Sequence, residues 1–331
     1  TARPPDDPPS NAETPRHAYA SPPEVGHHNQ AESNAEQQSN ALQQPTNPLA
    51  NQHSQGQPMN ASATTMPDIQ ASKDTRNVRI DKVGVKDIRH PLTLKTRDGS
   101  TQTTVAEINM YVSLPHHQKG THMSRFMQIL AEHNQSGALH PEEIVSLAQD
   151  VKNRLSAEEA HLEISFPYFT NKAAPVTGVS GLIDHEAAFH VSSAPTGDEI
   201  ELSVKVAAAS LCPCSKEISD YGAHNQRCEV SARVAFDGTL WIEDLVDMLE
   251  ASASCPVYPI LKRADEKFVT EAAYDNPKFV EDSIRDLAVI LNNDDRIKRY
   301  TIKSENFESI HNHNAYAEIA FDKTSNNPSP V

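Results

Sequence analysis

The sequence predicts an α+β protein built from two tandem ββααββ modules, each an antiparallel sheet with helices on one face. Two observations lead to this class: strand-like segments flank pairs of segments with helical spacing, and the same order of segments occurs twice along the chain. A third observation is a change of composition near residue 65, which separates the N-terminus from the patterned part. Strands and helices that are apolar on one side bury those sides against each other, which gives a layered fold.

Residues 1–65 are predicted to be a disordered tail. The segment is rich in Pro, Gln, Asn and Ser, and ten of the 23 prolines lie in it. With so few large apolar side chains, it cannot bury enough surface to offset the entropy of ordering it. It also has no charged region followed by an apolar run, so we do not expect a secretory signal.

The first module is expected over residues 66–196. Strand-like character runs through 83–94, Asp98-Gly99 indicates a hairpin turn, and apolar residues alternate over 106–114. Two helices follow, the first around 126–130 and the second from Pro141 to Leu155, with proline at the favoured first position. Alternation at 162–166 and a weaker pattern at 187–191 indicate two closing strands.

The second module is expected over residues 197–331 and has the same order. Strands are predicted at 200–206 and 228–236, followed by a helix over 242–249. Asn276 and Pro277 resemble the cap and first position of a further helix that extends to Leu291. Strands near 297–305 and 315–321 complete the module. The two copies share order but little sequence, so the repeat is architectural.

Composition excludes several classes of protein. The chain has 29 basic and 45 acidic side chains, a net charge of -16, so a broad nucleic-acid-binding surface is not expected. No apolar run is long enough to cross a bilayer. Four unevenly spaced cysteines are too few for a disulfide framework and indicate a reducing compartment. Of these, Cys228 and Cys255 are expected to be small core residues.

The stretch from Ser210 to Arg227 is a candidate metal site. Cys212, Cys214 and His224 provide thiol and imidazole donors, the set that zinc and neighbouring metals prefer. A C-x-C pair with one histidine supplies three ligands at most, which is typical of a catalytic site with a vacant position. If the preceding strand extends this far, both cysteines share a face with Ser210. The alternative is a pair of inward-facing strand cysteines and a loop histidine.

Two further clusters carry groups that could take part in chemistry. Glu308, His311 and His313 lie near the C-terminus, and histidines two apart face the same way on an extended chain and suit proton transfer near neutral pH. The alternative is a polar hairpin connection with solvated histidines.

Lys119, His122 and Arg125 precede or begin the first helix, where cations could hold a phosphate. The alternative is an ordinary helix start. Glu266 is expected as a solvated charge in the connection between the helices of the second module. Glu281 lies on a helix beside apolar residues and is expected to be partly buried, which is costly for an unpaired carboxylate.

Four segments together resemble type IB GTP cyclohydrolase. They are LPHHQKGTHMSRF (114–126), SLCPCSKEISDYGAHNQR (210–227), DEKFVTEAAYDNPKFVED (265–282) and SENFESIHNHNAY (304–316). The resemblance extends from about Met66 to Phe321 and leaves out the tail. It implies the tunnelling fold, with two ββααββ modules per chain and a homotetramer whose active sites lie at subunit interfaces. It also implies a cytoplasmic enzyme that converts GTP and water to 7,8-dihydroneopterin triphosphate and formate, the first step of folate biosynthesis.

The resemblance also implies a role for each matched residue. Cys212, His224 and Glu266 would bind a divalent metal, with zinc, manganese and iron(II) as candidates, and Cys214 is the alternative thiolate. Glu281 would hold the guanine edge. The remaining implied roles are the reacting centre for His311, His313 and Glu308, and contact with the triphosphate, from a neighbouring subunit, for Lys119, His122 and Arg125.

Two alternative functions belong to other classes. A nitrile reductase of the queuosine pathway shares the fold and uses a cysteine and an anchoring glutamate, but its cysteine is a nucleophile and it consumes NADPH. A non-catalytic protein could use the same thiols and histidines to buffer zinc. Consumption of NADPH without a metal would indicate the first, and metal binding without GTP turnover would indicate the second.

Overall fold

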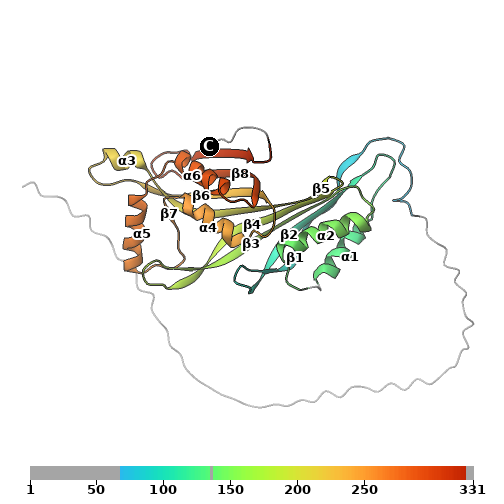
Figure 1. The fold of residues 1–331 in the computed structure, drawn as a ribbon, viewed down its shortest axis with the longest axis horizontal. Coiled ribbons are helices and arrows are strands. Elements are labelled where there is room, and N and C mark those ends of the chain that lie inside the picture. Colours follow the sequence, from blue (N-terminus) through green and yellow to red (C-terminus); the bar gives the residue numbers. More distant parts are fainter. Residues whose placement is uncertain (1–67, 135–136, 326–331) are drawn as a thin grey trace, which may run out of the picture. The chain divides into compact units, whose positions relative to one another are not determined.

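The computed structural model describes residues 68–134 and 137–325, so the tail predicted at 1–65 lies outside the described residues. Within that part of the chain, nine strands and six helices make a mixed α+β unit (Figure 1). The first half contains β1 (Ile80–Lys95), β2 (Thr101–Leu114), α1 (Met123–Asn134), α2 (Pro141–Arg154), β3 (Ala160–Ala173) and β4 (Ser180–Ala194). The second half contains β5 (Gly197–Leu211), α3 (Pro213–Ile218), β6 (Asn225–Phe236), α4 (Ile242–Ser252), β7 (Cys255–Pro256), α5 (Arg263–Asp275), α6 (Val280–Asn292), β8 (Ile297–Asn306) and β9 (Ala315–Asp322).

The described strands form one antiparallel sheet. Its order is β1-β2-β3-β4-β5-β6-β8-β9, and the short β7 pairs with β5. The α+β class is therefore confirmed, and the first half has the predicted order of two strands, two helices and two strands. The second half departs from it, because α3 lies between its first two strands and β7 and α5 lie between α4 and α6. The halves join at the tight β4–β5 hairpin, where Ala194 pairs with Gly197. The division into modules at 66–196 and 197–331 stays a prediction, since both halves share this sheet. No helix in the described ranges is long and apolar enough to cross a membrane.

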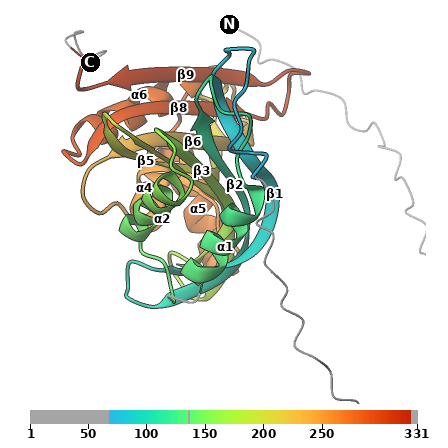
Figure 2. The ribbon, with the colours of Figure 1, turned by 90° about the vertical axis from the view of Figure 1, so that its right-hand side faces the viewer.

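One face of the sheet carries the hydrophobic core. Alternate strand residues point to it, and the apolar sides of the helices cover it, as Figure 2 shows for α1, α2 and α4. Leu202 on β5 and Leu287 on α6 are examples of fully buried residues from the two layers. Cys228 and Cys255 are buried too, and burial raises the pKa of the Cys228 thiol to about 12. Both are core residues as predicted, and Cys228 stays a neutral thiol at physiological pH.

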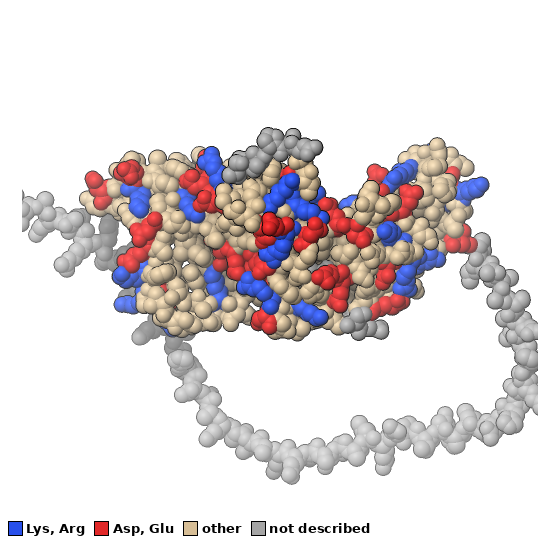
Figure 3. Space-filling model, in the orientation of Figure 1, with Lys and Arg blue, Asp and Glu red and all other residues tan. Residues whose placement is uncertain are grey.

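The opposite face of the sheet is held together by charged side chains. Ion pairs link strands across it: Lys205 on β5 pairs with Glu186 on the neighbouring β4 at 2.8 Å, and Arg299 on β8 reaches across β6 to Glu201 on β5 at 2.8 Å. Figure 3 shows the other side of the molecule, which the helices cover, and there too Lys and Arg lie among Asp and Glu. Cross-strand pairs of opposite charge stabilise an antiparallel sheet modestly and suit a face in contact with water.

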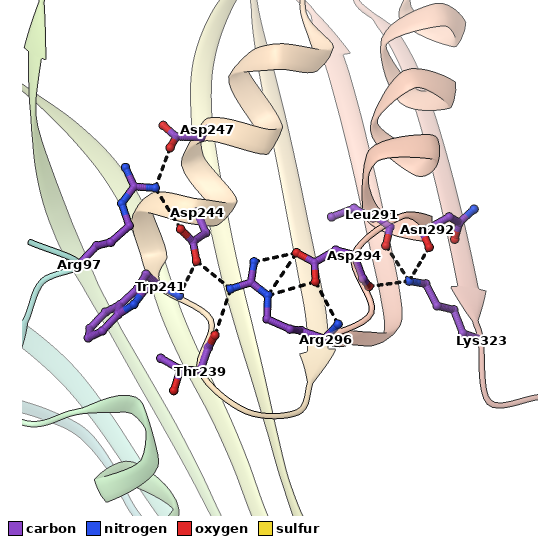
Figure 4. A network of polar contacts seen from close by, with 10 residues as sticks. All are labelled: Arg97, Thr239, Trp241, Asp244, Asp247, Leu291, Asn292, Asp294, Arg296 and Lys323. Atoms are coloured by element: carbon purple, nitrogen blue, oxygen red, sulfur yellow. Dashed lines mark hydrogen bonds and ion pairs between the residues drawn. The ribbon is translucent and has the colours of Figure 1, made fainter.

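A network of ion pairs connects the first hairpin to the second half (Figure 4). Arg97, in the β1–β2 turn, donates to Asp244 at 3.0 Å and to Asp247 at 2.8 Å on α4. Arg296 donates to the other oxygen of Asp244 at 2.9 Å. Burial alone would raise the pKa of Asp244, but hydrogen bonds from the two guanidinium groups hold it below its usual range. Asp244 therefore stabilises the contact between the halves in its ionised form.

The structure corrects the predicted helix boundaries near the end of the second half. The last helix begins at Val280 and not at Pro277. Asn276 does not cap it; its backbone N–H caps the end of α5, and its side chain donates to the carbonyl oxygens of Ala253 and Ser254 at 3.2 and 3.0 Å. This long-range contact holds the turn and is invisible to local sequence patterns.

Candidate active site

The Cys212 turn joins strands β5 and β6. Strand β5 ends at Leu211, Cys212 is the N-cap of α3, and Pro213 occupies its first turn. Proline there lacks an N–H and cannot continue the β ladder, so it ends the strand. The backbone N–H of Cys212 donates to the carbonyl oxygen of His224 at 3.2 Å, and this contact sets the thiol-bearing and imidazole-bearing residues side by side.

The two cysteines of this turn differ in environment. Cys212 is half-buried, and the backbone N–H of Ser215 lies 3.5 Å from its sulfur, whereas Cys214 is exposed on α3. The expectation that Ser210, Cys212 and Cys214 share one strand face is therefore wrong, because the strand ends before Cys212. Of the two cysteines, Cys212 is the one whose backbone is hydrogen-bonded to that of His224.

His224 is oriented by two side chains. Its Nδ1 lies 2.8 Å from Gln226 Oε1 and 3.2 Å from Ser309 Oγ. An amide oxygen can only accept, so Nδ1 is the donor to Gln226, and Nε2 takes no part in these two contacts. Histidines that bind metals are commonly oriented in this way, with one nitrogen donating to a nearby oxygen and the other left for the metal.

Gln226 is a site residue that the sequence analysis missed. It is 8% exposed, and its Nε2 donates to Glu308 Oε1 at 3.2 Å while its Oε1 accepts from His224. The Gln226 side chain thus links Glu308 to the imidazole of His224 through one hydrogen bond on each side. A signal was present in the sequence, because Gln226 continues the buried alternation of Cys228 and Val230, where an amide needs partners.

The loop after β8 carries three predicted site residues. Glu308 contacts Gln226, and Ser309 contacts His224, so the start of the loop docks on the Cys212 turn. The His311 and His313 rings stack, with centroids 5.3 Å apart, and both side chains are exposed. The two histidines do face the same way, although they lie in a connection between strands and not on an extended strand.

Glu266 and Glu281 lie on helices, and both are exposed. Glu266 is in the first turn of α5, so its prediction as a loop residue is wrong. The expected partial burial of Glu281 is also wrong for this chain, because Val280 and Ile284 take the inward side of α6. Among the residues that the structure describes, no three His, Cys, Asp or Glu side chains are grouped to hold a metal. The structure brings Cys212 and His224 together but does not add Glu266 to them.

The residue before Glu266 fixes the start of its helix. Asp265 is 0% exposed and accepts hydrogen bonds from the backbone N–H of Val176, Thr177 and Lys262, each at 2.9 Å. The Thr177 hydroxyl adds a fourth at 2.7 Å. Burial alone would raise the pKa of Asp265, but these hydrogen bonds hold it well below its usual range. An ionised Asp265 therefore ties α5 to the β3–β4 turn.

The predicted phosphate-binding cluster lies before and within the start of α1. Lys119 and Arg125 are exposed, and His122 Nε2 lies 3.1 Å from Asp68 Oδ2. Helices α1 and α3 are drawn at opposite ends of the sheet in Figure 1. The cluster and the Cys212 turn of one chain are therefore not brought together.

Comparison with known proteins assigns the chain to a family of enzymes. A model of the family described as "Type I GTP cyclohydrolase folE2" matches residues 66–317. The chain is 54% identical over 261 residues to the GTP cyclohydrolase FolE2 of Magnetococcus marinus, which covers 79% of this chain and 98% of that protein. It is 52% identical over 256 residues to the FolE2 of Nitrosococcus oceani, covering 77% and 95%.

The class of the chain is therefore that of the type I GTP cyclohydrolases. Within that class, it belongs to the folE2 family. The resemblance thus predicted the GTP cyclohydrolase class correctly, and its finer type IB assignment stays a prediction. Among solved structures, the uricase of Arthrobacter globiformis is similar over 76% of this chain and 96% of the uricase chain, with 9% sequence identity and a TM-score of 0.46. That similarity is too low to support an argument about fold or function.

Proposed function

We infer from the family membership that this chain is a GTP cyclohydrolase. It converts GTP and water to 7,8-dihydroneopterin triphosphate and formate, the first step of folate biosynthesis. The observation that carries a proposal for its active site is the backbone contact of Cys212 with His224, whose Nδ1 is held by Gln226. The family match favours this function over both the nitrile reductase and the zinc buffer.

We propose that Cys212 and His224 bind a divalent metal and that Glu266 is the third ligand. A half-buried thiol, an imidazole and a carboxylate form a mixed donor set that accepts zinc, manganese or iron(II). When bound, such a cation supplies Lewis-acid activation of water at neutral pH. Cys214 is exposed on α3, which makes it the weaker candidate for the thiolate.

The remaining predicted residues are assigned to substrate. Glu281 would accept hydrogen bonds from the guanine edge, and its exposure leaves its oxygens accessible to a ligand. His311 and His313 would transfer protons during ring opening and closure, for which imidazole suits neutral pH. Glu308 reaches this centre through Gln226.

We propose that the enzyme has the tunnelling fold and works as a homotetramer with its active sites between subunits. Lys119, His122 and Arg125 would then bind the triphosphate at the Cys212 turn of a neighbouring subunit, consistent with the placement of α1 and α3 in Figure 1. Large apolar side chains are also exposed in the segments around the site, as at Phe279 and Ile310. Apolar surface of this kind is typical of an interface. We further propose that the enzyme is cytoplasmic, in keeping with its free cysteines.

The test is GTP turnover by metal-stripped protein that is reconstituted separately with zinc, manganese and iron(II). The product is oxidised to a fluorescent pterin, which reports the reaction directly. Pterin formation with at least one metal and none without metal is the expected result. Turnover that is equally fast in the metal-stripped protein would refute the metal site, and NADPH consumption would indicate the nitrile reductase.

A further inference from the structure

A buried polar bridge joins three segments that lead into the site. Asn306, the last residue of β8, donates from Nδ2 to Ser210 Oγ at 3.0 Å. Ser210, at the end of β5, donates from Oγ to the carbonyl oxygen of Lys278 at 3.3 Å. Ser210 and Asn306 are 2% and 4% exposed, so bulk water does not compete for these contacts. We call these three residues the buried bridge.

The buried bridge makes a connection that the sheet itself does not make. Strand β6 lies between β5 and β8, so no backbone hydrogen bonds join those two strands. Ser210 pairs with Gln226, and Asn306 pairs with Cys228 two residues further along β6. The Asn306 side chain therefore reaches across β6 on the buried face to contact Ser210.

The third residue of the bridge fixes the turn before α6. The Lys278 backbone N–H donates to the carbonyl oxygen of Leu211 at 3.1 Å, so its main chain contacts the end of β5 twice. Its ammonium group donates to the carbonyl oxygen of Ser252 at 2.9 Å and pairs with Asp286 at 2.8 Å. The turn is thus attached to β5, to α4 and to its own helix.

The stability of the fold alone does not require the polar contacts of the buried bridge. Apolar side chains of similar shape could fill the same space at little or no cost, whereas a buried polar group must find its partner. The two hydrogen bonds of the bridge specify one relative position of the segments they join, although Asn306 Oδ1 has no partner among the described residues. The buried bridge therefore selects one relative position of the ends of β5 and β8 and the turn before α6.

We propose that Ser210 and Asn306 are positioning residues for the active site, an inference that rests on the site proposed above. Cys212, Glu281 and Glu308 follow the three bridged residues by two, three and two positions in the sequence. The bridge sets the thiol, the guanine-binding carboxylate and the histidine-bearing loop at fixed separations. A misplacement of 1 Å in such a constellation costs on the order of a hundredfold in rate.

The test uses the full-length, metal-loaded enzyme, four single variants and one double variant. Ser210→Ala removes both contacts of the hydroxyl, Asn306→Leu removes one contact with little change of shape, and Ser210→Thr keeps the hydroxyl. The matched control is Ser304→Ala, because Ser304 is 0% exposed on the same side of β8 and its Oγ has no hydrogen-bond partner among the described residues. The kcat and KM for GTP are measured well below the melting temperature of each variant.

We expect Ser210→Ala and Asn306→Leu each to lower kcat by about tenfold, through misplacement of the reacting groups. Ser304→Ala should stay within about twofold of the wild type, since it removes no contact. Ser210→Thr should retain most of the activity. The Ser210→Ala/Asn306→Leu double variant should be no slower than the slower single variant, because both changes break the same bridge. A wild-type kcat in Ser210→Ala, or losses that multiply in the double variant, would overturn the proposal.

Hydrogen exchange tests the buried bridge independently of the proposed active site. The backbone amides of Asn276, Lys278 and Phe279 and those of residues 307–314 should exchange faster in Ser210→Ala than in Ser304→Ala. If no metal supports GTP turnover by the wild type, the proposed site is wrong, and this comparison still tests the bridge. Equal exchange in the two variants would refute it.

Discussion

Replacing Gln226 by leucine tests whether the orientation of His224 controls metal binding. The change keeps the volume but removes the acceptor at 2.8 Å from His224 Nδ1 and the donor at 3.2 Å from Glu308. Removing a group that orients a metal-binding histidine typically costs 10–100-fold in metal affinity. The loss should lie near the lower limit, about tenfold or 1.4 kcal/mol, because Ser309 Oγ still lies 3.2 Å from Nδ1.

The assay is competition for zinc or manganese against a chromophoric chelator, with GTP turnover measured on the same samples. Gln102→Leu is the matched control, because Gln102 also makes two hydrogen bonds, to the backbone of Phe169 at 2.8 Å each, away from the site. The control should lose stability and keep its metal affinity. An unchanged metal dissociation constant in Gln226→Leu would refute the proposed role of the glutamine.

Three further predictions concern the ligand, the substrate and the fold. Cys212→Ala should weaken metal binding by more than about a hundredfold and abolish turnover, while Cys214→Ala should retain both; the reverse result in metal titrations would exchange the two thiols. Glu281→Gln should raise the KM for GTP by about tenfold or more, because one acceptor becomes a donor, and an unchanged KM would exclude guanine binding there. Arg97→Met should lower the free energy of unfolding by up to about 1 kcal/mol at pH 7, as measured in urea. Because the pKa of Asp244 is lowered in the folded protein, the stabilisation by this ion pair is complete above the ordinary carboxyl pKa of about 4. It should be lost as the pH falls below that value and Asp244 takes up a proton. An equal effect of Arg97→Met at low pH would contradict the ion pair.

The order of the long strands and most of the helices was predictable because its signals are local, whereas α3, β7 and α5 were missed. Alternation at 106–114 reports one buried strand face, and the spacing of Ile144, Leu147 and Val151 reports one buried helix face. These periods hold wherever a segment has one apolar side, whatever it packs against. The sequence also predicted the core positions of Cys228 and Cys255 correctly.

The details that failed depend on partners distant in the sequence. Asn276 looked like a helix start, yet its side chain is bound by the end of α4. The predicted strand through Cys212 ends early because Pro213 follows it. Gln226 forms no recognisable functional motif of its own. Its role follows from its hydrogen bonds to His224 and to Glu308, and Glu308 is distant in the sequence.

The position of the site follows from where strands end. The Cys212 turn, the start of β6 and the loop after β8 lie at one edge of the sheet because β5, β6 and β8 are neighbours in it. The cations of the α1 cluster come from the other end of the described fold (Figure 1). A triphosphate that extends from a guanine held near Glu281 would therefore meet those cations on a second copy of the chain. If so, Arg125→Ala subunits mixed with Cys212→Ala subunits should recover part of the turnover that each lacks, and mixtures with no activity would place both groups in one subunit.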